Sequence, residues 1–189
     1  MGQAKSLSPR ELRRVLDHLA TRPHASRNRA MLLLTHWAGM RVGEVAALRV
    51  EDVVSVDGTV RAEVRLDASQ TKGKHAPVVF LNHKLRKELA AHLKASGDRP
   101  GHMPLFGTQK RAAFSANTLC QTFNTIYRDA GLDGASSHSG RRTFITTLAN
   151  KGIGVRVLAA LAGHRNINTT QRYIDINDEM KRAAVEMVT

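Results

Sequence analysis

The feature that most constrains the fold is one β-type stretch within a sequence whose patterning is otherwise helical. Between about residues 52 and 81, short runs of β-branched residues alternate with turn sequences, as in strands joined by tight turns. The runs include Val53-Val54, Thr59-Val60 and Val78-Val79-Phe80, and the turns include Asp57-Gly58 and Thr71-Lys72-Gly73-Lys74. We therefore predict a mainly α chain of the α+β class, with one small antiparallel β-sheet of three strands.

The rest of the sequence predicts helices with recognisable ends. Ser8, Pro9 and Glu11 form a capping box that starts the first helix, and Asn82 can cap a later one. Further helices are predicted at about 26–38 and 41–48 and from 82 onward, with breaks at 97–104, 131–137, 152–154 and 163–168.

The composition is that of one folded domain without disulfides or a zinc site. A chain of 189 residues, 42% hydrophobic and 24% charged, is long enough to bury a core. Cys120 is the single cysteine, and its amphipathic surroundings indicate a half-buried, unreactive thiol. No histidine and cysteine spacing typical of a structural zinc site is present.

The charge points to an anionic partner. Twenty-nine Lys and Arg residues against sixteen Asp and Glu give a net charge of +13, which favours an anionic partner, most commonly nucleic acid. The basic residues are spread along the whole chain, whereas membrane binding would gather them in one helix or tail. Since the sequence has neither an apolar run of the ~20 residues that span a bilayer nor a secretory signal, we expect a cytoplasmic protein.

Cutting a phosphodiester without a metal requires a nucleophile, positive charge for the phosphorane and a proton for the leaving oxygen. Arginine suits the second task because its guanidinium binds two phosphate oxygens and stays charged. Lysine or histidine can supply the proton, and tyrosine is a reasonable nucleophile whose phenoxide also leaves readily. The sequence contains all of these residue types and no acidic cluster suited to magnesium.

Five segments, in this order, resemble the catalytic domain of the tyrosine recombinases, the phage integrase family. They are 39–48 (GMRVGEVAAL), 71–74 (TKGK), 138–144 (HSGRRTF), 161–164 (LAGH) and 169–173 (TTQRY). The resemblance covers nearly the whole chain, from about Leu7 to Met187. Its most specific part is the Gly-His pair followed nine residues later by the tyrosine, with His-x-x-Arg upstream.

The resemblance implies how the phosphate would be held. Arg41 and Arg141 would clamp the scissile phosphate, and His164 would donate a hydrogen bond to a non-bridging oxygen. Glu44 is interpreted as structural, orienting an arginine or its helix.

The resemblance also implies how protons and the covalent bond would move. Tyr173 would form a 3′-phosphotyrosyl link, Lys72 would protonate the departing 5′ oxygen, and His138 would assist proton transfer or hold the phosphate. Neither ATP nor a metal would be needed. Lys74 is an alternative to Lys72, and Tyr127 fits an ordinary half-buried tyrosine better than a nucleophile.

Two positions depart from the family pattern, which commonly has leucine before its second arginine and histidine after it. Gly140 and Arg142 occupy these places. Glycine should loosen the helix there by about 1 kcal/mol relative to alanine.

The domain organisation implied by the resemblance is a single catalytic domain, 1–189, without the usual amino-terminal core-binding domain. Family members usually act as tetramers on DNA. The residues after Asn177 predict an amphipathic helix that either docks on a neighbouring protomer or packs on its own domain. Two alternatives to a recombinase are a DNA-binding regulator with little cleavage and a type IB topoisomerase.

Overall fold

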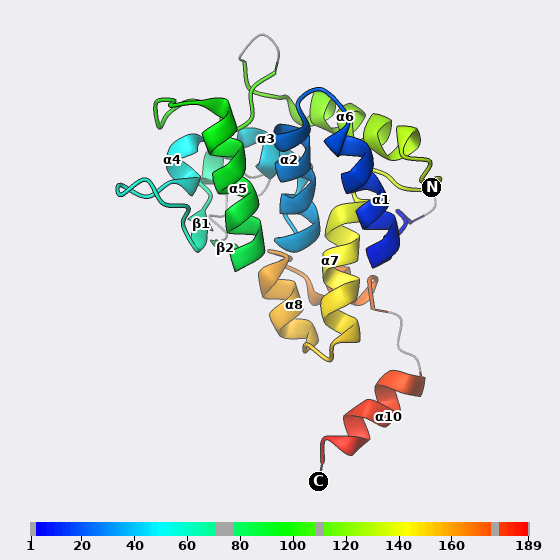
Figure 1. The fold of residues 1–189 in the computed structure, drawn as a ribbon. Helices are drawn as coiled ribbons and strands as arrows, with labels where there is room; N and C mark the ends of the chain where they lie inside the picture. Colours follow the sequence, from blue (N-terminus) through cyan, green and yellow to red (C-terminus); the bar gives the residue numbers. More distant parts are fainter. Residues whose placement is uncertain (1–2, 71–77, 109–111, 175–177, 189) are drawn as a thin grey trace.

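A computed structural model of the chain describes residues 3–70, 78–108, 112–174 and 178–188. Within these ranges it is mainly helical, with one two-stranded antiparallel sheet (Figure 1). None of the helices in the described ranges is long and apolar enough to cross a membrane. The elements are α1 (Pro9–Ala20), α2 (Ala25–Trp37), α3 (Val42–Ala47), α4 (Val50–Val53), β1 (Glu63–Arg65), the 3-10 turn η1 (Ala68–Gln70), β2 (Val78–Phe80), α5 (His83–Ser96), α6 (Ala116–Asp129), α7 (Ser139–Asn150), α8 (Val155–Leu161), α9 (Ile167–Gln171) and α10 (Asp178–Glu186).

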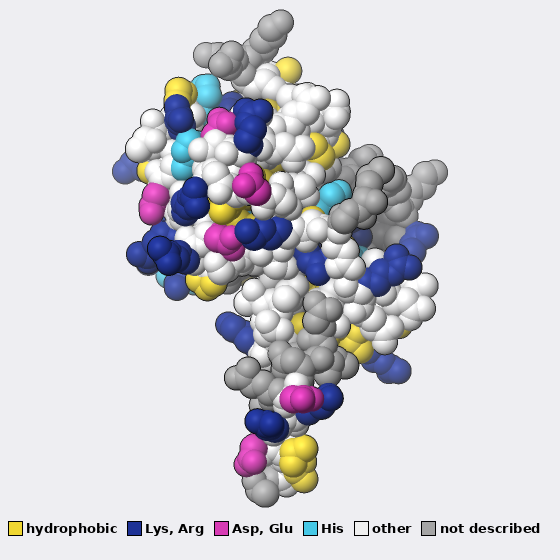
Figure 2. Space-filling view, turned by 90° about the vertical axis from the view of Figure 1, so that its right-hand side faces the viewer, with side chains coloured by type: hydrophobic (Ala, Val, Ile, Leu, Met, Phe, Trp, Pro, Cys, Tyr) yellow, Lys and Arg dark blue, Asp and Glu magenta, His cyan; other side chains and the backbone are white. Residues whose placement is uncertain are grey.

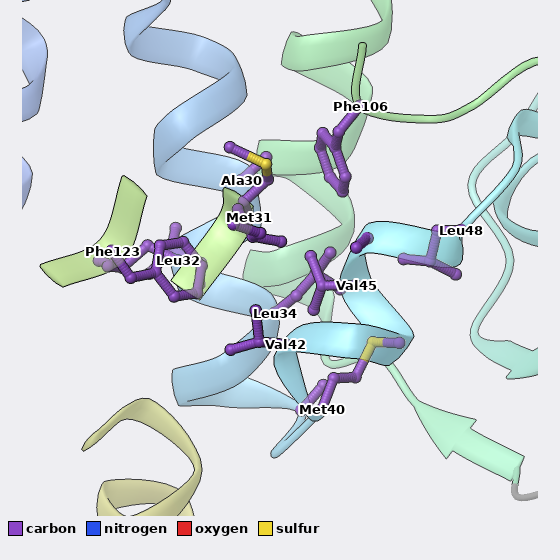
Figure 3. Packing of buried hydrophobic residues seen from close by; sticks show 14 of the residues in the cluster. Ala30, Met31, Leu32, Leu34, Met40, Val42, Val45, Leu48, Phe106 and Phe123 are labelled. Carbon is purple, nitrogen blue, oxygen red and sulfur yellow. The ribbon is translucent and has the colours of Figure 1, made fainter. Parts of the chain in front are cut away.

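Helix α2 lies at the centre of the helical body, packed against α1, α3, α5 and α7 (Figure 1). Its residues from Ala30 to His36 are all buried, as expected for a helix covered on every side. Figure 3 shows Leu32 of α2 beside Phe123 of α6, and Leu34 beside Val45 of α3. This packing fixes the positions of α3 and α7, which carry the candidate arginines.

The predicted helix starts are confirmed by their capping hydrogen bonds. The Ser8 hydroxyl accepts from the Glu11 N–H at 3.3 Å, and the Glu11 carboxylate accepts from the Ser8 N–H at 2.9 Å. The Asn82 side chain accepts from the Leu85 N–H at 2.9 Å. Both caps satisfy backbone donors that have no partner within the helix.

The β-type stretch contains a smaller sheet than the sequence predicts. Strand β1 pairs with β2 with Val64 opposite Val79, and both side chains are buried. The third strand is not confirmed: Val54 forms only an isolated antiparallel bridge with Val60. Val53 ends the helical turn α4 instead, because the Asp52 carboxylate accepts from the Arg49 N–H at 2.8 Å and closes that turn.

The segment after α5 is irregular for longer than the sequence predicts. Helix α6 begins only at Ala116, whereas the pattern predicts helix from residue 105. Leu105 and Phe106 are buried in the core without being helical, and the Leu105 N–H donates to the Leu48 carbonyl at 2.8 Å. This pairing with the chain after α3 keeps the segment out of a helix, so its apolar residues fill the core from a loop.

The carboxyl-terminal helices lie at one end of the body. Helices α7 and α8 contact each other, as do α8 and α9. Helix α10 extends away from the helical body in Figure 1, and the end of the chain approaches that body where Met187 lies near Gly152. The start of α7 and the ends of α8 and α9 meet the start of α3, and Arg41, Arg141, His164 and Tyr173 lie at this junction.

Candidate active site

Arg41 lies at the turn between α2 and α3. Gly39 makes this turn with φ +66°, and a Cβ there would come within 2.5 Å of the Phe144 ring of α7, so only glycine fits. Arg41 then occupies the position before the first turn of α3. Its side chain is 41% exposed, and its Nη2 donates to the carbonyl of Gly163 at 3.1 Å.

Glu44 holds Arg41 in this position. Its carboxylate accepts from the Arg41 backbone N–H at 2.8 Å and from the Arg41 Nη1 at 2.7 Å. The Glu44 side chain is only 5% exposed, so this ion pair is shielded more than a surface pair. The interpretation of Glu44 as a structural residue that orients an arginine and its helix is confirmed.

Arg141 is buried in the first turns of α7 and binds two loops at once. Its Nη1 donates to the Gly39 carbonyl at 2.6 Å, and its Nη2 donates to the Ala162 carbonyl. Burial, and secondarily the charge of Arg41, lowers the pKa of Arg141 to about 10. The guanidinium therefore remains charged at neutral pH.

The two arginines converge on the loop after α8. Arg141 binds the carbonyl of Ala162, and Arg41 binds that of the next residue, Gly163. These carbonyl partners carry no formal charge. Among the described residues, the carboxylate of Glu44 is the one acidic group that directly contacts either guanidinium. Two guanidinium cations that converge on one loop are of the residue type that can bind an oxyanion.

His164 follows the same loop and is held by a threonine. Its backbone N–H donates to the Ala159 carbonyl at 2.9 Å, and its Nδ1 lies 2.8 Å from Oγ1 of Thr170 in α9. Burial, followed by the charges of Arg141 and Arg41, lowers the pKa of His164 to about 4. The ring is therefore neutral at pH 7, and when the Thr170 hydroxyl donates to Nδ1 the ring hydrogen is on Nε2.

Tyr173 lies just after α9 with its ring against two of these side chains. The ring stacks on His164, with centroids 6.0 Å apart and an interplanar angle of 18°. The guanidinium carbon of Arg142 lies 5.6 Å from the Tyr173 ring centroid. Tyr173 is also close enough to Arg141 for a phenolate charge to raise the arginine pKa. The tyrosine and both arginines are thus brought together, as predicted.

The other tyrosine and the cysteine have different surroundings. Tyr127 is 1% exposed, and its hydroxyl lies 3.0 Å from Nε2 of His36 in α2. Burial raises the pKa of Tyr127 well above its ordinary value, so its phenol is unsuited to attack a ligand at the surface. Cys120 is half-buried on α6, as predicted.

The structure does not show the other two predicted residues, His138 and Lys72, in this cluster. His138 is exposed at the residue before α7, and no hydrogen bond links its ring to Arg41, Arg141, His164 or Tyr173, all of which are described. Lys72 and its alternative Lys74 lie outside the described residues.

Two residues of the site were not assigned a role from the sequence. Thr170 belongs to the TTQRY segment, and its place six residues after His164 is the signal that a hydroxyl could reach the imidazole. Arg142 was noticed only as a departure from the family pattern. Its contact with Tyr173 joins residues 31 apart in the chain, which spacing alone does not predict.

The outer surface of the molecule near α1, α6 and α7 is basic. Figure 2 shows Lys and Arg side chains spread over the face near α1, α6 and α7, with fewer Asp and Glu among them. The described residues contain no group of three or more His, Cys, Asp or Glu side chains placed to bind a metal ion. The cluster itself supplies two guanidinium cations, an imidazole and a phenol.

Comparisons with known proteins all point to the same protein family. The model of the phage integrase family matches residues 5–180. A tyrosine recombinase of Pseudothermotoga lettingae is 30% identical over 95% of this chain and 59% of its own length. The tyrosine recombinase XerA of Thermococcus kodakarensis is 28% identical over 96% of this chain and 62% of its own length.

Solved structures show the same fold. The crystal structure of a XerA recombinase matches 99% of this chain and 66% of its own, with a TM-score of 0.76 and 25% identity. The Tn1549 transposon integrase, in complex with circular intermediate DNA, matches 100% of this chain with a TM-score of 0.75 and 18% identity. The chain spans about three fifths of the length of these curated relatives.

Proposed function

The chain belongs to the phage integrase family, and from this membership we propose that it is a site-specific DNA recombinase that cuts and rejoins strands through Tyr173. Residues 1–189 would make up one catalytic domain. The observation that carries the proposal is the convergence of Arg41 and Arg141 on the adjacent carbonyls of Ala162 and Gly163, next to the ring of Tyr173.

In the proposed cleavage step the phosphate enters between the two arginines. Arg41 and Arg141 would neutralise the charge of the phosphorane through fixed N–H donors. His164, neutral because its pKa is about 4, would donate from Nε2 to a non-bridging oxygen. The donors are already held by Glu44, Thr170 and backbone carbonyls, so little reorganisation is needed when charge develops.

Bond making and breaking would balance without ATP or a metal. The Tyr173 oxygen bonds to phosphorus as the bond to the 5′ oxygen breaks, and the phenolic proton passes toward His138 or solvent. Lys72 would give a proton to the 5′ oxygen. In the reverse direction a 5′ hydroxyl of another strand attacks the phosphotyrosine, which restores the phenol and joins the new pair of strands.

The partner is proposed to be double-stranded DNA, bound by a tetramer of the chain in the cytoplasm. The net charge of +13 supports this partner, and the Tn1549 integrase of the same fold holds DNA in its structure. The carboxyl-terminal end of the described chain supports assembly: Val185 in α10 and Met187 and Val188 just after it are 68%, 76% and 84% exposed. Exposed apolar side chains of this kind suit docking on a second copy.

The α10 part of the proposal is tested by deleting the residues after Asn177 and measuring assembly on DNA by native electrophoresis. We expect complexes of single protomers to form and larger complexes to be lost. Unchanged assembly would mean that α10 packs on its own domain and does not dock on a neighbouring protomer.

The cleavage proposal is tested with duplex DNA from the sequences flanking the gene, nicked near each candidate site so that the cut end diffuses away. The wild-type chain is expected to form a denaturant-stable protein–DNA adduct, and Tyr173→Phe is expected to form none. Tyr127→Phe is the matched control, because it removes one phenolic hydroxyl elsewhere, and it should keep the adduct.

Two outcomes would favour the alternatives. Salt-sensitive DNA binding without any adduct would indicate a DNA-binding regulator. Relaxation of supercoiled plasmids without a specific site would indicate a type IB topoisomerase. An adduct at full yield in Tyr173→Phe would remove Tyr173 as the nucleophile.

A further inference from the structure

Residues 3–7 lie along one face of α7 and are held there by three side chains of that helix. The Leu7 N–H donates to Thr143 Oγ1 at 2.9 Å in a buried hydrogen bond. The hydroxyls of Ser6 and Thr146 lie 3.4 Å apart, and Arg142 Nη1 donates to the Gln3 side-chain oxygen. The amino-terminal segment, residues 3–7, is therefore docked on the helix that carries Arg141.

Two of these α7 side chains also contact Tyr173. The Arg142 guanidinium carbon is 5.6 Å from the Tyr173 ring centroid, and the Thr146 hydroxyl donates to the Tyr173 carbonyl at 3.4 Å. Arg142 and Thr146 are four residues apart, so they project from the same side of the helix. The ring and the backbone of Tyr173 are thus each contacted by a residue that also contacts the amino-terminal segment.

The chemistry of Arg142 suits this double contact. Its planar guanidinium can face an aromatic ring while an N–H at its edge donates to the Gln3 amide oxygen. None of the ion pairs among the described residues involves Arg142. In the part of the chain that the structure describes, its guanidinium lies against the Tyr173 ring.

We propose that Arg142 is a positioning residue for Tyr173, and that Gln3 in the amino-terminal segment fixes Arg142 in the orientation that holds the ring. Whatever moves residues 3–7 then also moves the nucleophile. The consequence for catalysis rests on the proposed function of Tyr173, whereas the coupling between Gln3, Arg142 and Tyr173 does not.

Positioning of this kind matters because the attacking oxygen must be in line with the leaving oxygen. A misplacement of about 1 Å can slow an enzyme roughly 100-fold. Tyr173 lies after a helix of five residues, Ile167–Gln171, so that short helix provides little restraint. Contacts with α7 supply the restraint that the local structure lacks.

The coupling can be measured without any cleavage, by NMR of protein labelled with ¹³C at the tyrosine ring ε positions. The chain has two tyrosines, so the spectrum shows Tyr173, assigned by its loss in Tyr173→Phe, and Tyr127 as an internal reference. Arg142→Ala should shift the Tyr173 signal, and Gln3→Ala should shift it in the same direction by less. The Tyr127 signal should stay in place in both variants.

The effect on catalysis is measured as single-turnover adduct formation at saturating DNA, beside the Kd for DNA. We expect Arg142→Ala to slow adduct formation about 10-fold with Kd changed less than about threefold. Arg142→Lys, which keeps the charge, should recover part of the rate lost in Arg142→Ala. Gln3→Glu, which keeps an acceptor for Arg142, should form the adduct faster than Gln3→Ala. The matched control is Arg128→Ala on α6, which removes one exposed arginine paired with Asp129 and should keep the wild-type rate.

A Tyr173 signal that does not move in Arg142→Ala would overturn the proposal, as would an equal loss of rate in Arg128→Ala. If Arg142→Ala fails to fold, Gln3→Ala carries the test alone, because Gln3 is exposed. In that case an unmoved Tyr173 signal in Gln3→Ala would overturn the proposal. A failure of Tyr173 as nucleophile would instead appear as an adduct in Tyr173→Phe, with the NMR coupling unaffected.

Discussion

Nδ1 of His164 lies 2.8 Å from Oγ1 of Thr170, and the Thr170 side chain is completely buried. The hydroxyl is therefore available to this imidazole and not to solvent. By donating to Nδ1 it would leave the ring hydrogen on Nε2, where a phosphate oxygen can accept it. The Thr170 hydroxyl thus occupies Nδ1 of His164 and leaves Nε2 as the nitrogen free to meet a ligand.

Replacing Thr170 by valine keeps the volume and removes the hydroxyl. We expect adduct formation to slow roughly 10-fold, less than the loss when a preorganised donor is itself removed, with DNA affinity little changed. The control is Thr169→Val, which alters the exposed neighbour and should keep the wild-type rate. Equal rates in the two variants would show that Thr170 does not orient His164.

The depressed pKa of His164 predicts a definite pH dependence. Its pKa is about 4 in the folded chain and 6.5 ordinarily, so the unfolded state binds more protons between these values. The contribution of His164 to stability is complete above pH 6.5 and is lost as the pH falls toward about 4. His36, with a pKa lowered to about 3 by burial, acts in the same direction.

NMR titration of ¹³C-labelled histidine, with His164 assigned by its loss in His164→Gln, measures this value directly. We expect a midpoint near 4. A midpoint near 6.5 would mean that the ring is solvated and that Arg41 and Arg141 do not act on it.

Gly140 predicts an outcome opposite to helix propensity. Alanine is favoured over glycine in helices by about 1 kcal/mol, but a Cβ at Gly140 would lie 2.0 Å from Thr35 Oγ1 and 2.7 Å from Thr35 Cβ. We expect Gly140→Ala to lower the free energy of unfolding by about 1–3 kcal/mol, measured by urea denaturation. Adding Thr35→Ala to Gly140→Ala should recover part of the lost free energy of unfolding. If the two substitutions instead change that free energy additively, Gly140→Ala does not clash with Thr35.

Much of the site could be predicted because its residues lie in short local patterns. Arg41, Arg141, His164 and Tyr173 each stand in a short segment next to a turn or a helix end, so their positions could be predicted, while their roles stay predictions. The capping box of α1 is equally local. Contacts between distant segments were not visible: Gly140 was judged by helix propensity, whereas the structure explains it by the approach of α2 to α7.

The errors in the fold have the same origin. Val53 was assigned to a strand because β-branched residues favour strands, but Asp52 closes a helical turn around it. Leu105 was assigned to helix, although its backbone pairs with Leu48, which is 57 residues earlier in the chain. In both places a hydrogen bond decided the conformation against the residue's own preference.

Tyr127 should matter for stability and not for cleavage. Its hydroxyl is the hydrogen-bond partner of His36 Nε2, and His36 Nδ1 is already buried without a partner among the described atoms. Tyr127→Phe is therefore expected to lower the free energy of unfolding by about 1–3 kcal/mol. Tyr173→Phe, at a half-buried position, should change it by less than about 0.5 kcal/mol. Equal losses in the two variants would contradict this division between the tyrosines.

The central claim is that Tyr173 becomes covalently joined to DNA, and the most direct test is to locate the linkage by tandem mass spectrometry. Adduct formed on a nicked duplex is digested with nuclease and protease, and the nucleotide-bearing peptide is sequenced. We expect a phosphorylated nucleotide on Tyr173 and none on the peptide that contains Tyr127. A linkage at any other residue, in adduct that forms at the wild-type rate, would contradict the claim.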